Sequence, residues 1–350
     1  NGQPDLLDEA RFNLDWMLTM QDPDDGGVYH KLTRLNFSGF VMPADDTADR
    51  YVVQKSTEAA LDFAAVTAFA ARVYAATDPG YSSTLATAAR NAWDWALLNP
   101  QTNYVQPADV STGRYAISGD DLVDEWDWAR VELFLLTGDG GFVAGWSANN
   151  AGGGVPWWGY VTPMAWLSVV RDATADPDLR IAAENHILAA ADNLVATADN
   201  GYRVSMDGNE FNWGSNGTMA TRGVLLAHAY ALTGHAAYLD TAVSGVDYIF
   251  GRNPVGISYV TGTGTTSPMF IHHRQSGADG IDEPVPGLVA GGPNPHQQDA
   301  GGCPVSYPSN LPALSYLDHQ CSYASNEIAI NWSASLVAAL FFVHQQLEAP

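Results

Sequence analysis

The segment Ala129-Arg-Val-Glu-Leu-Phe-Leu-Leu-Thr137-Gly138, followed four residues later by Phe142, decides the fold. It predicts an apolar helix that stops at a glycine suited to the left-handed C′ position, with an aromatic residue that packs back on the finished helix. The same pattern recurs at Ala71–Thr77 and at Ala227–Gly234, each again followed within four residues by a tyrosine. The chain is therefore expected to repeat a unit of helix, stop and second helix.

Apolar residues at helical spacing extend this pattern over the whole chain, and no convincing run of alternating strand residues occurs, so the class is all-α. Asp5 is expected to cap the first helix. The predicted helices cover residues 6–20, 56–76, 82–97, 120–137, 140–147, 162–172, 179–197, 216–233, 236–250 and 325–346. An open solenoid predicts short, uniform connections. The connections here are long and uneven, above all 251–324, which favours an α/α toroid with its loops gathered around a cleft.

Composition excludes several classes of protein. Of the 350 residues 46% are apolar and 15% are charged, which suits a large core. Asp and Glu number 39 against 15 Lys and Arg, giving a net charge of −24. A chain of this charge repels a phosphate backbone, so nucleic acid is excluded as a partner. The apolar stretch Leu336–Val343 is far too short to span a bilayer, and we expect no membrane partner.

Two features indicate an exported protein, although Asn1 is not preceded by a leader and the chain is read as a mature form or an excerpt. Cys303 and Cys321 are the two cysteines of the chain, and a disulfide between them would contribute about 3 kcal/mol. A zinc site that adds His296 or His319 is the weaker alternative, because short Cys-x-x-Cys spacing is missing. The second feature is the number of aromatic residues, 11 Trp and 15 Tyr, which suggests flat apolar platforms.

The first candidate for chemistry is the stretch from Tyr316 to Trp332, which contains two carboxylates. We expect Ser325 to cap the last helix, with Glu327 in its first turn and Asp318 on the preceding loop. Burial and the charge of Asp318 would then favour the protonated form of Glu327, while the helix N-terminus would favour the ionised form. The alternative is that Glu327 only complements the helix dipole.

The second candidate is the loop around His272, His273 and Arg274. Adjacent histidines on a loop seldom ligate one metal together, so hydrogen bonding to a hydroxyl-rich ligand is the better interpretation. The alternative is that the two imidazoles only satisfy backbone carbonyls of the long loop. If Asp318 accepts hydrogen bonds from the backbone or from Arg274, it stays charged and can orient its neighbours.

These motifs resemble the catalytic domain of glycoside hydrolase family 9, the inverting cellulases, in the bacterial branch that carries an N-terminal immunoglobulin-like module. The family has one sequence pattern around His272 and a second around Asp318 to Glu327. This chain departs from the first at Thr266 and from the second at Ser333. The matching stretches are Pro4–Glu9, Gly27–Lys31, Phe63–Val66, Trp213–Asn216, Gly251–Pro254, His272–Arg274, Pro284–Leu288 and Asn326–Glu327.

The resemblance implies one catalytic domain over residues 1–350 with an (α/α)6 toroid, here missing its first helix or so, and an open cleft for a β-1,4-linked glucan. It implies that Glu327 is the general acid, with Asp318, His272 and Arg274 in the surrounding polar shell. The family's general base lies in an Asp-Ala-Gly-Asp motif upstream of the matched segment, and no such motif occurs in this chain. Aromatic and imidazole contacts to sugar rings are expected from His30, Trp213, Tyr323, Trp157 and Trp158, the last two with a core role as the alternative.

Calcium is the expected cofactor, in a structural role, and no organic cofactor is expected. Asp121, Asp124 and Glu125 offer hard oxygen ligands at a helix start, although the two aspartates could instead act as caps. The side chains of Ser276 and Asp279 with the carbonyl of Ile281 resemble a second family site.

The expected function is that of a secreted, monomeric endo-β-1,4-glucanase that hydrolyses cellulose or related β-glucans with inversion. An exo-acting β-glucosaminidase on chito-oligosaccharides is an alternative, since a strongly negative cleft suits a cationic sugar. A non-catalytic carbohydrate-binding toroid is a third reading, suggested by the absence of the general base from this chain.

Overall fold

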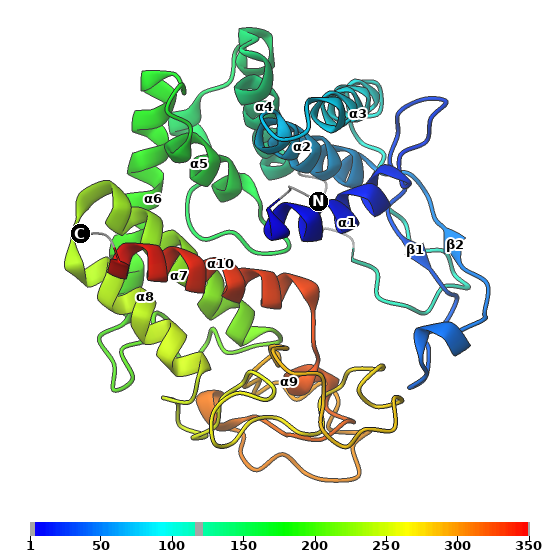
Figure 1. Cartoon of the computed structure of the whole chain (residues 1–350), viewed down its shortest axis with the longest axis vertical. Helices are drawn as coiled ribbons and strands as arrows, with labels where there is room; N and C mark the ends of the chain where they lie inside the picture. The colour runs from blue at the N-terminus through cyan, green and yellow to red at the C-terminus, as the bar shows by residue number, and fades with distance from the viewer. Residues whose placement is uncertain (1–3, 116–121, 349–350) are drawn as a thin grey trace. The chain divides into compact units, whose positions relative to one another are not determined.

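The computed structural model describes residues 4–115 and 122–348, and these are predominantly helical, as the sequence predicts (Figure 1). The α-helices of these residues are α1 Asp5–Leu18, α2 Thr57–Tyr74, α3 Pro79–Leu98, α4 Val123–Thr137, α5 Thr162–Arg171, α6 Pro177–Thr197, α7 Ser215–Thr233, α8 Ala236–Ile249, α9 Tyr323–Asn326 and α10 Ile330–Glu348. Four 3-10 turns lie between them, at η1 Pro43–Asp45, η2 Gly140–Val143, η3 Ala148–Asn150 and η4 Pro312–Leu314.

The chain divides into two compact units. Unit 1 consists of residues 1–37 and 48–186, and unit 2 consists of residues 38–47 and 187–350. Each unit has its own buried apolar core.

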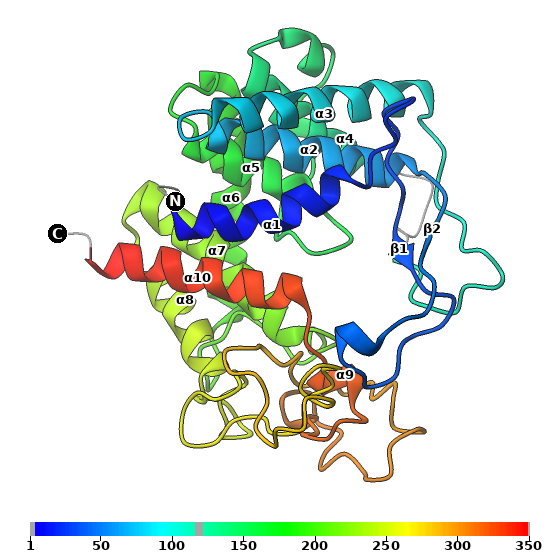
Figure 2. The same ribbon diagram turned by 45° about the vertical axis from the view of Figure 1, so that its right-hand side comes forward.

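In unit 1 the helices α2 and α3 form an antiparallel hairpin, and α4 packs against α2 (Figure 2). The hydroxyl of Ser56 caps α2 by accepting the amide of Ala59, and the carboxylate of Asp78 caps α3 by accepting the amide of Tyr81. The facing sides of these helices are rich in alanine, so that the helix axes can approach closely. The alanines of this core are Ala60, Ala64, Ala65, Ala68, Ala88, Ala89, Ala92, Ala96 and Ala129.

The helix ends that the repeated pattern predicts are confirmed. Gly138 and Gly234 end α4 and α7 in the left-handed conformation, with φ of 68° and 69°. Tyr81 packs back on the preceding helix, where its ring lies edge-on to Tyr74 at 5.1 Å. The helix predicted over 140–147 is wrong, because only the turn η2 forms there, and the glycines at 140 and 141 that begin it disfavour a longer helix.

In unit 2 the helices α7, α8 and α10 pack against one another, and the long connection 251–324 lies at one end of them (Figure 1). Among the described residues this connection contains only the turn η4 and the first residues of α9, as its glycines and prolines predict. Isolated backbone bridges nevertheless tie it together, pairing Val260 with Val289 and Ala290 with Ile328. The core beneath it includes Val289, Tyr259 and Leu336.

Three details at the ends of elements differ from the prediction. The first helix begins at Asp5 itself, with Pro4 as the residue before it, so Asp5 is not the cap. The last helix is interrupted, since α9 and α10 are separate elements. A short antiparallel pair, β1 Leu32–Thr33 with β2 Tyr51–Val52, was not predicted because two-residue strands carry no periodic signal. None of the helices within residues 4–115 and 122–348 is both long and apolar enough to cross a membrane.

Candidate functional site

Glu327 lies on extended backbone between α9 and α10, with φ of −69° and ψ of 153°. Two neighbouring segments hold it there. The amide of His272 donates to the carbonyl of Asn326 at 2.9 Å, and the amide of Gly291 donates to the carbonyl of Glu327 at 2.9 Å. His272 and Glu327 thereby form a parallel bridge. The carboxylate is therefore presented from a short strand-like segment that is paired on both sides.

The prediction that Ser325 caps the last helix is wrong. Its hydroxyl accepts the amide of Leu317 at 3.1 Å and shares a hydrogen bond with Ser322 at 2.8 Å. The first turn of α10 starts three residues after Glu327, so the helix dipole does not act on this carboxyl as predicted. Pairing with the 271–272 and 290–291 segments overrides the local helical pattern.

The surroundings of Glu327 decide its protonation. Burial raises the pKa of this carboxyl, while a hydrogen bond from Trp213 and the charge of Arg274 act in the opposite direction. The indole Nε1–H of Trp213 donates to Oε2 of Glu327 at 3.0 Å. Burial is the largest of these effects, so the net direction is upward, which is the direction a proton donor requires.

Asp318 accepts two backbone hydrogen bonds, the arrangement that was considered for it from the sequence. Its Oδ2 accepts the amide of Met269 and its Oδ1 accepts the amide of Phe270, both at 2.9 Å. A third donor is Nδ2 of Asn326, at 3.1 Å from Oδ1. Asp318 thus fastens the segment that leads to His272 onto the segment that carries Glu327.

His272 and Arg274 are held in the same unit. The imidazole Nδ1 of His272 lies 2.7 Å from the carbonyl of Gln320, which only accepts, so the proton sits on Nδ1. Burial lowers the pKa of His272, so the ring is neutral with Nε2 as its acceptor. The guanidinium of Arg274 donates through Nε to the carbonyl of Ser38 at 2.9 Å.

Two aromatic rings contact each other at this site, and that of Trp213 reaches the carboxyl of Glu327. The rings of Trp213 and Tyr323 lie 5.3 Å apart with an angle of 33° between their planes. Trp213 is 41% exposed, so part of its ring is open to solvent while its Nε1–H contacts the carboxyl. An exposed ring next to an acid can stack on a pyranose whose linking oxygen faces that acid.

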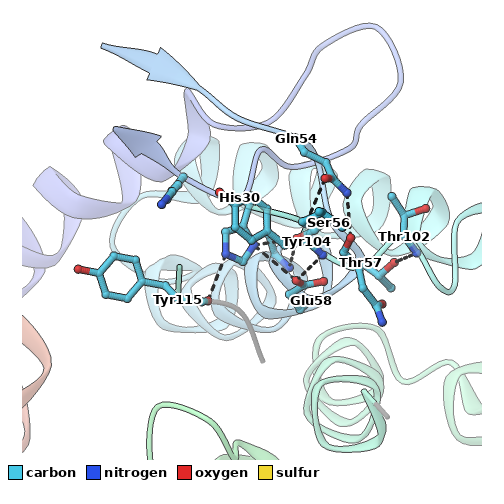
Figure 3. Close-up of polar contacts among 12 residues, drawn as sticks. His30, Gln54, Ser56, Thr57, Glu58, Thr102, Tyr104 and Tyr115 are labelled. Atoms are coloured by element: carbon cyan, nitrogen blue, oxygen red, sulfur yellow. Dashed lines mark hydrogen bonds and ion pairs between the residues drawn. The ribbon is translucent and has the colours of Figure 1, made fainter. Parts of the chain in front are cut away.

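In unit 1 the predicted sugar contact His30 is held on three sides (Figure 3). Its Nε2 donates to the carbonyl of Tyr115 at 3.1 Å, its Nδ1 lies 3.0 Å from the hydroxyl of Ser56, and its ring stacks on Tyr104 at 3.8 Å. Burial lowers the pKa of His30, against the nearby charge of Glu58. The side chain of His30 is only 5% exposed, and its contact with a sugar stays a prediction.

Glu58, which was not predicted as a site residue, organises this cluster. Its Oε1 lies 3.6 Å from Nδ1 of His30 and accepts the amide of Tyr104 at 3.0 Å (Figure 3). Glu58 is 4% exposed. Glu58 lies in the first turn of α2, where an acidic residue ordinarily complements the helix dipole. Its role in holding Tyr104 and His30 is therefore visible only in the folded structure.

Trp157 and Trp158 are also in unit 1 and are 55% and 63% exposed. Their rings contact each other edge to face at 5.5 Å. A core role for this pair is therefore wrong, and the interpretation as exposed aromatic platforms is the one that fits.

The predicted calcium ligands differ in how well they suit a cation. Asp121 lies outside the described residues. Glu125 is 1% exposed and its Oε2 has no hydrogen-bond partner, while Oδ2 of Asp124 accepts the amide of Val161 at 2.8 Å. Burial, with Asp124 and Asp62 nearby, raises the pKa of Glu125 to about 9. A buried, unpartnered carboxylate oxygen in a group of acids is the environment that a bound cation would relieve.

The second predicted calcium site is already engaged in hydrogen bonds. The hydroxyl of Ser276 lies 2.9 Å from Nδ1 of His273 and accepts the amide of Val285, and Oδ1 of Asp279 accepts the amide of Ile281. Among residues 4–115 and 122–348, no three acidic, histidine or cysteine side chains converge as metal ligands.

The cysteines form the predicted disulfide. Cys303 and Cys321 are bonded, with their Cα atoms 5.3 Å apart, which excludes the alternative zinc site. The bond ties the 303–321 loop to the segment immediately before Tyr323.

Comparisons with known proteins identify the family of this chain. The family model for glycosyl hydrolase family 9 matches residues 1–340. A xyloglucan-specific endo-beta-1,4-glucanase of Bacteroides ovatus is 44% identical over 97% of this chain and 60% of its own length. Endoglucanase D of Acetivibrio thermocellus is 35% identical over 97% of this chain and 53% of its own length. The chain thus spans little more than half the length of these relatives.

Solved structures show the same fold. A family 9 protein of Bacteroides ovatus superposes with a TM-score of 0.87 at 41% identity, covering 98% of this chain and 63% of that one. The family 9 endoglucanase J30 superposes with a TM-score of 0.90 at 33% identity, covering 98% of this chain and 64% of that one. These likenesses agree with the predicted (α/α)6 class. With a family model matched along nearly its whole length, this chain belongs to glycosyl hydrolase family 9.

Proposed function

We propose that residues 1–350 are a catalytic domain that hydrolyses β-1,4-glycosidic bonds of β-glucans in the endo mode and with inversion. The observation that carries the proposal is the carboxyl of Glu327, whose pKa burial raises, on a segment fixed by backbone pairing beside an exposed tryptophan. The endo mode and the β-1,4 linkage are supported by relatives that are named as endoglucanases.

In this mechanism the protonated carboxyl of Glu327 donates its proton to the oxygen that leaves as the glycosidic bond breaks. The Nε1–H of Trp213, already 3.0 Å from Oε2, then stabilises the carboxylate that remains. Water attacks from the opposite face and gives up its proton to a carboxylate, which in an inverting enzyme stands about 6.5–9.5 Å from the acid.

We infer that this second carboxylate comes from a segment upstream of residue 1, in the Asp-Ala-Gly-Asp motif of the family. The longer length of the relatives supports the inference, since the chain spans 60% of one and 53% of another. The same upstream region would supply the helix that completes the toroid, and an immunoglobulin-like module before it.

Substrate binding is assigned to aromatic side chains of each unit. In unit 2 these are the exposed Trp213 and the half-buried Tyr323, and in unit 1 they are Trp157 and Trp158, with His30 as a polar contact. Flat rings of this kind stack on the faces of pyranose units. The 44% identity to a xyloglucan-specific enzyme makes a branched β-1,4-glucan the first substrate to test.

We further propose that the protein is secreted, acts as a monomer and binds calcium in a structural role. The disulfide between Cys303 and Cys321 supports an oxidising compartment. The unpartnered Oε2 of Glu125 supports a cation at the start of α4, held by Asp124 and Glu125. No step of the hydrolysis depends on this cation.

The test is Glu327→Gln in the full-length protein. The amide oxygen can still accept from Trp213, so folding should be kept while the transferable proton is lost, and glucan hydrolysis should fall at least about 1000-fold. Glu283→Gln, which changes an exposed acid of the neighbouring loop, should leave hydrolysis unchanged. Undiminished turnover in Glu327→Gln would overturn the assignment. Release of glucosamine from chitosan oligomers would instead support an exo-acting glucosaminidase.

A further inference from the structure

We propose that Asn326 is the positioning residue of the acid site, holding Asp318 and the Glu327 segment in register, and that Tyr316 fixes the direction of its amide. The proposal rests on the proposed role of Glu327 as the acid. It concerns two side chains that have no part in the proton transfer itself.

The side chain of Asn326 is fully buried and uses all of its main hydrogen-bonding directions. Its Nδ2 donates to the carbonyl of Phe270 at 2.9 Å and to Oδ1 of Asp318 at 3.1 Å. Its Oδ1 accepts the hydroxyl of Tyr316. Asn326 is 0% exposed and Tyr316 is 3% exposed, so water cannot replace these bonds without reorganisation of the core.

The chemistry of the partners leaves one orientation for the amide. The carbonyl of Phe270 and the carboxylate of Asp318 only accept, so the nitrogen must face them. The oxygen must then face the hydroxyl of Tyr316, which can donate. A rotated amide would place an oxygen against two acceptors, so the network selects a single state.

The backbone carries this constraint to the acid. The carbonyl of Asn326 accepts the amide of His272, and the next residue is Glu327 in an extended conformation. Asn326 is the last residue of α9 and its side chain lies in the buried network, while the next residue, Glu327, contacts Trp213. Because the two residues are adjacent in the chain, holding the first restrains the second.

Other charged groups near this network must be considered before a pH test. The amide itself does not titrate. Apart from Asp318, the titratable groups of unit 2 around Tyr316, Glu327 and His272 include Tyr259, Tyr307, Arg274 and Asp299. All of them are present in the variants below, and a variant that cannot titrate at position 326 controls for their contribution.

The deciding variant is Asn326→Asp in the full-length protein, which has nearly the same shape but replaces the amide donor with a second carboxyl. At about pH 7 two carboxylates would face each other, and kcat should fall about 100-fold with little change in KM. At about pH 4.5 the pair can share a proton and restore an O–H donor toward Asp318. The ratio of variant to parent activity should therefore rise by at least about tenfold as the pH falls.

Two further variants show whether the amide acts as proposed. Asn326→Leu cannot take up a proton, so its ratio to the parent should stay low and constant with pH. Tyr316→Phe leaves in place both groups that accept hydrogen bonds from the amide of Asn326. Its kcat should therefore fall only about tenfold, and this fall should not depend on pH.

The outcomes separate the two proposals. An active parent with a constant ratio for Asn326→Asp would overturn the positioning role and leave the acid assignment intact. A folded full-length parent that hydrolyses no glucan would overturn the proposed function. As a readout apart from activity, the melting temperature of Asn326→Asp should approach that of the parent on acidification, and a constant difference would also count against the role.

Discussion

The disulfide between Cys303 and Cys321 offers the most direct test of how loop order supports the acid site. Replacing both cysteines with serine opens a loop with a sequence separation of 18. In the chain-entropy model a loop of this size contributes about 3 kcal/mol to the free energy of unfolding. Unit 2 contains roughly 170 residues, and for a domain of that size each kcal/mol shifts the melting temperature by about 2–4 °C. The expected loss is therefore about 6–12 °C.

The same loop carries two contacts of the site. The carbonyl of Gln320, next to Cys321, orients the imidazole of His272, and Tyr323 lies two residues beyond the disulfide. We expect the double variant to lose hydrolytic activity on warming before the parent does. The assay is calorimetry and glucan hydrolysis with and without a thiol reductant. Reductant should lower the melting temperature of the parent and leave the double variant unchanged. A parent that melts identically with and without reductant, under conditions that reduce the bond, would refute the reasoning.

Two further predictions concern protonation. In Trp213→Phe the hydrogen bond that favours ionised Glu327 is lost, so the pKa of Glu327 should rise. The alkaline limb of the kcat/KM profile should then move to higher pH. A shift toward lower pH would contradict the assignment of Glu327 as the acid. In calcium-free protein, burial raises the pKa of Asp62 from 3.8 to about 7 and that of Glu125 from 4.5 to about 9. Between the ordinary and the raised pKa values the folded state therefore holds more protons than the unfolded state. The melting temperature should fall as the pH rises through that range. Calcium should remove much of that fall, and identical melting profiles with calcium and with chelator would count against the site at the start of α4.

The helices were predictable because their signals are local. The alanine-rich face of α2 and the glycine at 138 belong to patterns of a few residues, and the structure places α2 at Thr57–Tyr74 against a predicted 56–76. The buried residues of these helices recur at the helical spacing that the sequence shows. Errors of one to three residues at the ends follow from capping details such as Pro4, which moves the start of α1 to Asp5.

The break before α10 was not predictable from local sequence. The residues from Ser325 to Ile330 combine a capping residue, an acid and an apolar run, which is the pattern of a helix start. What keeps Glu327 extended is pairing with residues 272 and 291, which lie 55 and 36 positions away in the chain. Long-range pairing of this kind leaves no periodic trace in one sequence.

The extended break also explains why burial, and not a helix end, controls the pKa of Glu327, the proposed acid. In the first turn of a helix the backbone amides would stabilise the carboxylate and oppose proton donation at neutral pH. On the extended segment, the backbone amides of His272 and Gly291 are spent on the carbonyls of Asn326 and Glu327, so they do not reach the carboxyl. Among the described residues, the indole of Trp213 donates a neutral N–H to the carboxyl, and Arg274 acts on it through its charge. These two groups can stabilise the carboxylate after transfer without cancelling the effect of burial before it, which is the balance that an acid catalyst needs.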